Sequence, residues 1–198
     1  MQTVIKRLKF LSSEIILGTL IAVLSVLAAV SGYQSSMADS DQTKYNVQGQ
    51  QTLTNANAEY LSVNQMIVYD YTMYDGWYTA DNDDKADYYK NSFSEELQTA
   101  MAATPDDPFS EAYYTAMQAE PQAMFDEADR LFKLAEEFNN RGDALQLILL
   151  VSALGLAFAA WASLLKDESP MRLLFAIFAI VIMAYSISLY VAVPVVAA

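Results

Sequence analysis

The sequence of 198 residues contains no histidine and no cysteine. These absences remove the usual ligands of zinc, haem and copper, as well as thiol chemistry and the Ser-His-Asp triad. The six glycines are scattered, so no glycine-rich phosphate loop is present. Carboxylates are plentiful, but no pair of them stands in an apolar setting that would raise one pKa for acid–base catalysis. The sequence therefore predicts a non-enzymatic protein without a cofactor.

Charge is missing from three long stretches of the chain. Residues 15–30, 144–165 and 173–193 contain no Asp, Glu, Lys or Arg. Roughly 20 apolar residues in a helix cross the hydrocarbon core of a bilayer, which is about 30 Å thick. We therefore predict three transmembrane helices, over residues 12–33, 144–165 and 173–193.

The basic residues near these stretches predict the orientation. They lie in the N-terminal segment 1–11 and in the loop 166–172, and the positive-inside rule places both in the cytoplasm. Segment 34–143 and the tail 194–198 are then extracytoplasmic. The residues that carry this argument are Lys6, Arg7, Lys9, Lys166 and Arg172. We expect a multi-pass protein of the cytoplasmic membrane, with the lipid bilayer as its first partner.

Segment 34–143 is strongly acidic. It holds 21 of the 24 acidic residues and six basic ones, for a net charge of −15. Such a charge argues against nucleic acid or an anionic lipid surface as a partner. Cationic proteins, divalent ions or a solvated acidic surface in a salty exterior remain open.

Helical periodicity continues beyond the first span. Apolar residues between positions 53 and 77 recur at intervals of three, four or seven, and no proline interrupts residues 35–78. We predict one helix from about Ser12 to Tyr78. A second helix is expected from Asp83 or Asp84, as its N-cap, to about Ala103.

Two prolines predict further helix starts. Asp107 is a plausible N-cap with Pro108 as the first helical residue, and Pro121 is expected to open another helix. Beyond Pro121, small and apolar residues follow a 4,3,4,3 spacing into the second span, which indicates a single packed helix with a bend at Gly142 or Asp143. These residues are Met124, Ala128, Leu131, Ala135, Phe138, Gly142, Leu145, Leu149 and Ser152.

The first span carries a stripe of small residues at the same spacing. Small side chains on a membrane helix let a second backbone approach closely, so we expect the stripe and the hydroxyl-bearing Ser152 to pack within the protomer or between protomers. The stripe consists of Gly18, Ala22, Ser25, Ala29 and Gly32.

Residues 68–89 combine aspartates and aromatic residues. Asp81, Asp83 and Asp87 form a weak candidate site for a divalent cation, but Lys85 occupies the third ligand position of an EF-hand pattern. Helix capping and solvation explain these acids better. The aromatic residues could form the core of a bundle, a small-ligand pocket or a contact surface for a partner. The candidate contact residues are Tyr74, Trp77, Tyr78, Tyr88 and Tyr89.

Four short strings resemble a family of uncharacterised bacterial three-span membrane proteins. They are "SGYQ" (31–34), "GWYTADNDDKADYYKNSF" (76–93), "DPF" (107–109) and "DEADRLFKLAEEFNNRGD" (126–143). The sequence departs from that family at Val30, where a tryptophan is common, and in having far fewer arginines on its helices. The resemblance implies a shared topology and brings no catalytic residues.

The fold that we predict is all-α, with three transmembrane helices and an extracytoplasmic helical bundle inserted between the first two. Two of the spans continue into long exterior helices. The function expected first is that of a structural or accessory subunit of a membrane assembly. The alternatives are a sensory input module for a separate signalling partner and a homo-oligomeric channel. The charge-free stretches of the three spans, residues 15–30, 144–165 and 173–193, contain no ionisable residue apart from tyrosine, which argues against a proton or ion relay.

Overall fold

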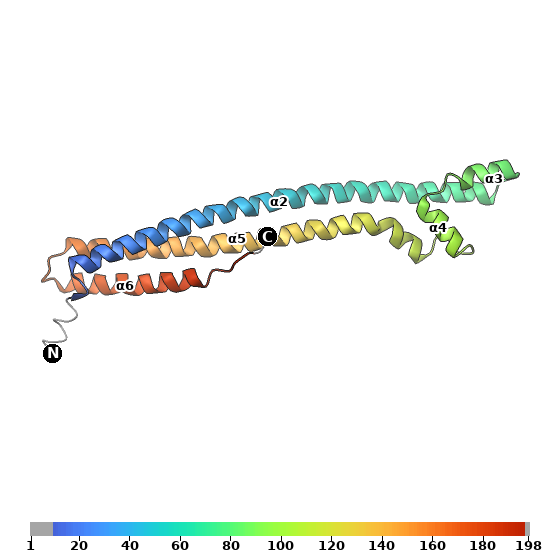
Figure 1. Cartoon of the computed structure of the whole chain (residues 1–198). Coiled ribbons are helices and arrows are strands. Elements are labelled where there is room, and N and C mark those ends of the chain that lie inside the picture. The colour runs from blue at the N-terminus through green and yellow to red at the C-terminus, as the bar shows by residue number, and fades with distance from the viewer. Residues whose placement is uncertain (1–9, 197–198) are drawn as a thin grey trace. The chain divides into compact units, whose positions relative to one another are not determined.

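A computed structural model describes residues 10–196, and within that range all regular secondary structure is helical (Figure 1). The helices are α2 (Glu14–Tyr78), α3 (Asp83–Lys90), α4 (Glu95–Ala103), α5 (Glu111–Leu164) and α6 (Pro170–Val191). The prediction of an all-α fold is confirmed. Helices α2, α5 and α6 are each long and apolar enough to cross a membrane. The predicted continuity of the first two spans with longer helices is confirmed as well, since α2 and α5 contain 65 and 54 residues.

The chain divides into two compact units. The first, here called the span unit, comprises residues up to Tyr45 and from Lys133 onward; the second, the acidic unit, comprises Asn46–Phe132. Helices α2 and α5 contribute to both units, whereas α6 belongs to the span unit and α3 and α4 belong to the acidic unit.

The core of the span unit is formed by leucine and alanine side chains from three helices. Leu17 and Leu20 of α2 pack with Ala159 of α5 and with Ala176 and Ala179 of α6. The alanines bring the helix backbones close together, as is common between membrane helices. The three candidate spans therefore form one packed bundle (Figure 1).

A buried arginine connects three helix termini of the span unit. Arg172, in the first turn of α6, is 5% exposed. Its Nε donates to the carbonyl of Ser12 before α2, and its Nη1 donates to the carbonyl of Leu165 after α5, both at 2.9 Å. Nη1 also pairs with Asp167 at 2.5 Å. Carbonyls at helix ends lack intrahelical donors, and the planar guanidinium can satisfy two at once.

The core of the acidic unit lies where α2, α4 and α5 meet. Ile67 of α2, Leu97 of α4 and Met117 of α5 are buried together there, with Phe93 from the segment between α3 and α4. Along the rest of the unit α2 and α5 pack on each other through small side chains and rings. An added Cβ at Gly49, for example, would lie 2.9 Å from the ring of Phe132.

The predicted helix from Asp83 to Ala103 is wrong, because it is two helices separated by residues 91–94. The predicted caps are wrong too. Asn82 caps α3 by accepting the Lys85 N–H at 3.0 Å, and Ser94 caps α4 by accepting the Leu97 N–H at 3.0 Å. Ser94 satisfies a donor that the helix itself cannot, so a second helix start here is favourable.

Both proline-based predictions are also wrong. Pro108 lies in the non-helical segment 104–110, and α5 begins at Glu111. Pro121 lies inside α5, where it is fully buried, rather than at a helix start. Proline in a helix interior removes one backbone hydrogen bond and crowds the carbonyl four residues earlier. Packing of its ring in the core of the acidic unit offsets part of that cost. Helix α5 also runs through Gly142 and Asp143 without interruption.

Candidate partner surface at the α2–α3 turn

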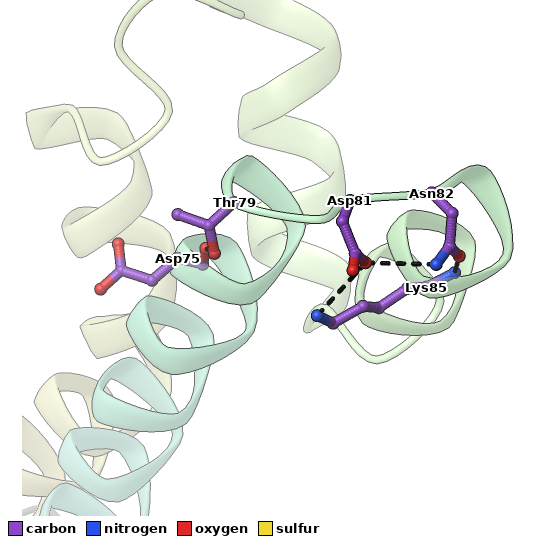
Figure 2. Close-up of polar contacts among 5 residues, drawn as sticks. All are labelled: Asp75, Thr79, Asp81, Asn82 and Lys85. Carbon is purple, nitrogen blue, oxygen red and sulfur yellow. Dashed lines mark hydrogen bonds and ion pairs between the residues drawn. The ribbon is translucent and has the colours of Figure 1, made fainter.

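The turn after α2 is built by local hydrogen bonds. Thr79 donates from its N–H and from Oγ1 to the carbonyl of Asp75, at 3.0 and 2.7 Å, which closes the last turn of α2. Asn82 then begins α3, and its Nδ2 donates to Oδ1 of Asp81 at 3.1 Å (Figure 2). Lys85 pairs with the same carboxylate at 3.4 Å. The polar side chains of this turn therefore interact with one another, and Asp81, Asn82 and Lys85 remain exposed to solvent.

Helix α3 is held by very few contacts. None of its eight residues is buried. Its Tyr89 ring lies directly over Gly76 of α2, where an added Cβ would come within 2.5 Å of a ring carbon. Tyr88 packs edge-on against Tyr89, with ring centroids 5.5 Å apart. An eight-residue helix is too short to be stable alone in water, so contacts of this kind fix its position.

Apart from Tyr89, the candidate contact residues divide into a partly buried pair and an exposed pair. Tyr74 and Trp77 are partly buried and pack on the core of the acidic unit, with their ring centroids 5.4 Å apart. Trp77 also meets Phe93 edge-on at 6.3 Å. Tyr78 and Tyr88, in contrast, are 75% and 67% exposed. The partly buried rings therefore support a surface on which Tyr78 and Tyr88 are presented to solvent.

A buried carboxylate lies beneath this surface. Asp70 of α2 has no exposed area. Its Oδ1 accepts the Ser94 N–H at 2.9 Å, and its Oδ2 accepts the Ser94 hydroxyl at 2.5 Å and the Tyr113 hydroxyl at 2.7 Å. Hydrogen bonds to a carboxylate are stronger than neutral ones, and buried charge is tolerated only when it is satisfied in this way. Asp70 thus links α2 to the cap of α4 and to the first turn of α5.

The hydroxyls around Asp70 are held in the neutral form. Burial and the neighbouring carboxylate of Asp70 raise the pKa of Tyr113 far above its ordinary value. The adjacent Tyr114 shares a hydrogen bond with the hydroxyl of Tyr71, and this bond raises the pKa of Tyr114 to about 12. Loss of the Tyr113 proton would place a phenolate beside Asp70, so the bond between them requires a protonated Tyr113.

Sequence reasoning missed Asp70, Ser94 and Tyr113. Ser94 could have been found from "SEEL", since a serine followed by acids in the next turn is typical of an N-cap. Asp70 has no such signal. Its partners lie 24 and 43 residues away in the sequence, and only the tertiary structure brings them together.

The candidate cation ligands do not converge. Asp81 is engaged by Lys85 and Asn82, and Asp83 lies exposed in the first turn of α3 with Asp87 one turn later. Among residues 10–196, no three His, Cys, Asp or Glu side chains are grouped so that they could hold a metal ion.

Of the first-span residues predicted to pack in the membrane, only one is partly buried against another helix of the protomer. Gly18, Ala22, Ser25 and Ala29 are exposed, whereas Gly32 is half-buried, its Cβ position 3.6 Å from Leu149 of α5. The side of α2 that packs within the span unit is instead the one formed by Leu17, Leu20, Leu24, Ala28 and Ser31.

Ser152 lies inside the span unit. It is fully buried on α5, together with Ser31 of α2 and Ser186 of α6. The three hydroxyls have no hydrogen-bond partner among the described residues. Serine is nearly as small as alanine, so these side chains permit close approach of the helices.

The net charge of the chain lies entirely in the acidic unit. The acidic unit contains 16 acidic and three basic residues, for a net charge of −13, which is the formal charge of the whole chain. The span unit contains eight of each sign. A partner attracted by charge would therefore be attracted to the acidic unit.

No protein-family model, curated protein or solved structure matches this chain. The resemblance to an uncharacterised bacterial family therefore stays a prediction, and the functional argument depends on the residues described above.

Proposed function

We propose that this chain is a non-enzymatic subunit of a membrane assembly, held in the cytoplasmic membrane by α2, α5 and α6. Its acidic unit is extracytoplasmic and binds a partner protein that carries a basic surface. The contact surface is the α2–α3 turn with its exposed tyrosines, Tyr78 and Tyr88.

The observation that carries this proposal is the exposure of Tyr78 and Tyr88, at 75% and 67%, among carboxylates. Asp75, Asp81 and Asp84 lie on the same turn and are exposed. Tyrosine is enriched at the centres of protein interfaces, and its ring also attracts cationic groups. Rings surrounded by acids therefore suit lysine- or arginine-bearing partners.

The topology in this proposal follows from the positive-inside rule. The basic segments 1–11 and 166–172 would be cytoplasmic and the acidic unit would be outside. The chain has no cysteine, so single-cysteine variants test this directly. A Tyr88→Cys variant in intact cells should react with a membrane-impermeant maleimide, whereas Lys166→Cys should react only after lysis. The reverse pattern would overturn the assigned side.

Partner binding is tested by photo-crosslinking in native membranes. A photoreactive residue at position 78 or 88 should capture one defined protein, and the same residue at Tyr33 of the span unit, 67% exposed, is the matched control. Recovery should fall as salt increases, because exposed charge pairs are screened within about 10 Å at 0.1 M salt. Capture of the same proteins at all three positions, or of none at 78 and 88, would contradict the proposal.

Replacement of Gly76 by alanine tests whether α3 must be docked. The new methyl group would occupy the place of the Tyr89 ring, which lies 2.5 Å from the Cβ position. We expect α3 to be displaced and capture at position 88 to fall several-fold, while the helix content measured by circular dichroism is unchanged. Undiminished capture at position 88 would show that the docked form of α3 is not the one that binds.

A further inference from the structure

The exposed side of α2 carries no charge over most of its length in the acidic unit, up to the exposed Asp75. Between Asn46 and Tyr74, the only charged residues of α2 are Glu59, which is half-buried, and Asp70, which is fully buried. Every exposed residue of that stretch is uncharged, although the unit as a whole has a net charge of −13. The remaining acids of the unit are Asp75, in the last turn of α2, and those on α3, α4, α5 and the connecting segments. Thus the exposed side of α2 from Asn46 to Tyr74 is free of the charge that covers the rest of the unit.

This side also exposes apolar residues at regular intervals. Val47, Leu61 and Val68 are 52%, 61% and 64% exposed, and with Thr54 they are spaced by seven residues. The positions four residues further on, 51, 58, 65 and 72, are glutamine, alanine, glutamine and threonine, and all are exposed. A 4,3 repeat of uncharged residues on one helix is the spacing with which two parallel helices pack side by side. The repeat extends for roughly 38 Å at 1.5 Å per residue.

The charge of the acidic unit determines which kind of molecule can pack against this repeat. Two copies of the chain carry the same −13, so any contact between their acidic sides would place like charges together. A twofold contact pairs a surface with its own copy, and α2 offers an uncharged surface for that purpose. A basic partner, in contrast, would be drawn to the acids and away from this side.

The span unit has a comparable surface of its own. Gly18, Ala22, Ser25 and Ala29 of α2 are exposed there, and apart from its own helical turn no part of residues 10–196 lies within 4 Å of a Cβ placed at Gly18. Small residues at this spacing let two membrane helices approach closely. Both units thus leave on α2 an uncharged surface suited to a second helix.

We infer that the chain forms a parallel homodimer in which the α2 helices of two copies pack against each other along the repeat from Val47 to Thr72. Both copies are inserted in the same membrane in the same direction, so each residue of the repeat lies opposite its own equivalent. This inference does not depend on the partner proposed for the α2–α3 turn.

Disulfide crosslinking of single-cysteine variants tests the dimer in the full chain. Purified protein is reconstituted into phosphatidylcholine vesicles with no other protein present. Thr54→Cys, Leu61→Cys and Val68→Cys lie on the repeat. Met66→Cys, exposed on another side of α2, and Ala123→Cys, exposed on α5, are the matched controls. A disulfide forms only when two Cα atoms come within about 7 Å, so crosslinking at the repeat should exceed the controls at least about fivefold.

Equal crosslinking at Leu61 and Met66 would indicate random collision and overturn the inference, as would crosslinking confined to Ala123. A second measurement avoids cysteine altogether. Leu61→Glu with Val68→Glu should convert dimer to monomer in native mass spectrometry, while Ala123→Glu should not. A wild-type chain that is monomeric in mild detergent and uncrosslinked in vesicles would refute the dimer. Partner capture at position 78 is a separate readout, so failure of one proposal leaves the other distinguishable.

Discussion

Replacement of Asp70 by asparagine should destabilise the acidic unit by about 3 kcal/mol. The two oxygens of Asp70 accept three hydrogen bonds, one at Oδ1 and two at Oδ2. Asparagine has one oxygen, which can keep the bonds from Tyr113 and the Ser94 hydroxyl. Its NH2 group then faces the Ser94 N–H, and a buried donor without an acceptor costs about 1–3 kcal/mol. Loss of the charge weakens the two remaining bonds by about another 0.5 kcal/mol each.

Tryptophan fluorescence is the assay for this destabilisation. The chain has two tryptophans, Trp77 beside the core of the acidic unit and Trp161 in the span unit. In a Trp161→Phe background, emission from Trp77 during urea unfolding in mild detergent reports the acidic unit alone. The control is Glu120→Gln, which removes an exposed acid on α5 and should change the free energy of unfolding by less than about 0.5 kcal/mol.

A double-mutant cycle separates the hydrogen bonds of Asp70 from its charge. Tyr113→Phe removes one of three donors and should cost about 1.5 kcal/mol. Because Asp70→Asn weakens by about 0.5 kcal/mol the same bond that Tyr113→Phe removes, the double variant should be less destabilised than the sum by about 0.5 kcal/mol. If Asp70→Asn costs no more than Glu120→Gln, or if the two changes are additive, the carboxylate does not connect the three helices energetically.

Three further outcomes are expected. Arg172→Lys should lower the free energy of unfolding of the span unit, measured by Trp161 fluorescence, by about 2 kcal/mol. Lysine cannot donate to two separate carbonyls in the fixed geometry of a guanidinium. The control Lys166→Ala, at an exposed position, should have little effect. Stability of the acidic unit should change little from neutral pH up to about pH 10 and then fall, by up to about 1.4 kcal/mol per pH unit for each tyrosine with a raised pKa. Above that pH the unfolded chain loses a proton that folded Tyr113 retains, and Tyr113→Phe should reduce the slope. Added salt should stabilise the acidic unit, measured by Trp77 fluorescence, more than it stabilises the span unit, whose net charge is zero. The reason is that salt screens the repulsion among like charges. An equal effect on both units would contradict this reasoning.

The long helices could be predicted because a single physical signal persists along each of them. The apolar spans are set by the length of the hydrocarbon core, and the spacing of core residues continues through the polar part of both α2 and α5. Ala128, Leu131, Ala135, Phe138 and Leu145 of the predicted repeat are all buried. A repeat that keeps its phase over many turns depends little on any one residue, so its prediction tolerates local irregularities.

The boundaries of the shorter elements are harder to predict because distant contacts help to set them. Ser94 begins α4, and beyond its local capping signal its position is fixed by Asp70, which is 24 residues earlier in the sequence. Pro121 has the local chemistry of a helix start, yet the packing of a buried ring keeps it inside α5. In both cases tertiary packing outweighs the local preference.

The two long helices of the acidic unit carry different surfaces, and this difference would let one unit serve both of the contacts that we propose. Helix α5 exposes Glu120, Asp126 and Asp129, while α2 exposes only uncharged side chains between Asn46 and Tyr74. If the acids served only to keep the unit soluble, they would be expected along the exposed sides of both helices. The absence of exposed acids from this stretch leaves it able to approach a second copy without repulsion. The acids are then directed at solvent and at a basic partner, so self-association and partner binding need not compete for the same residues.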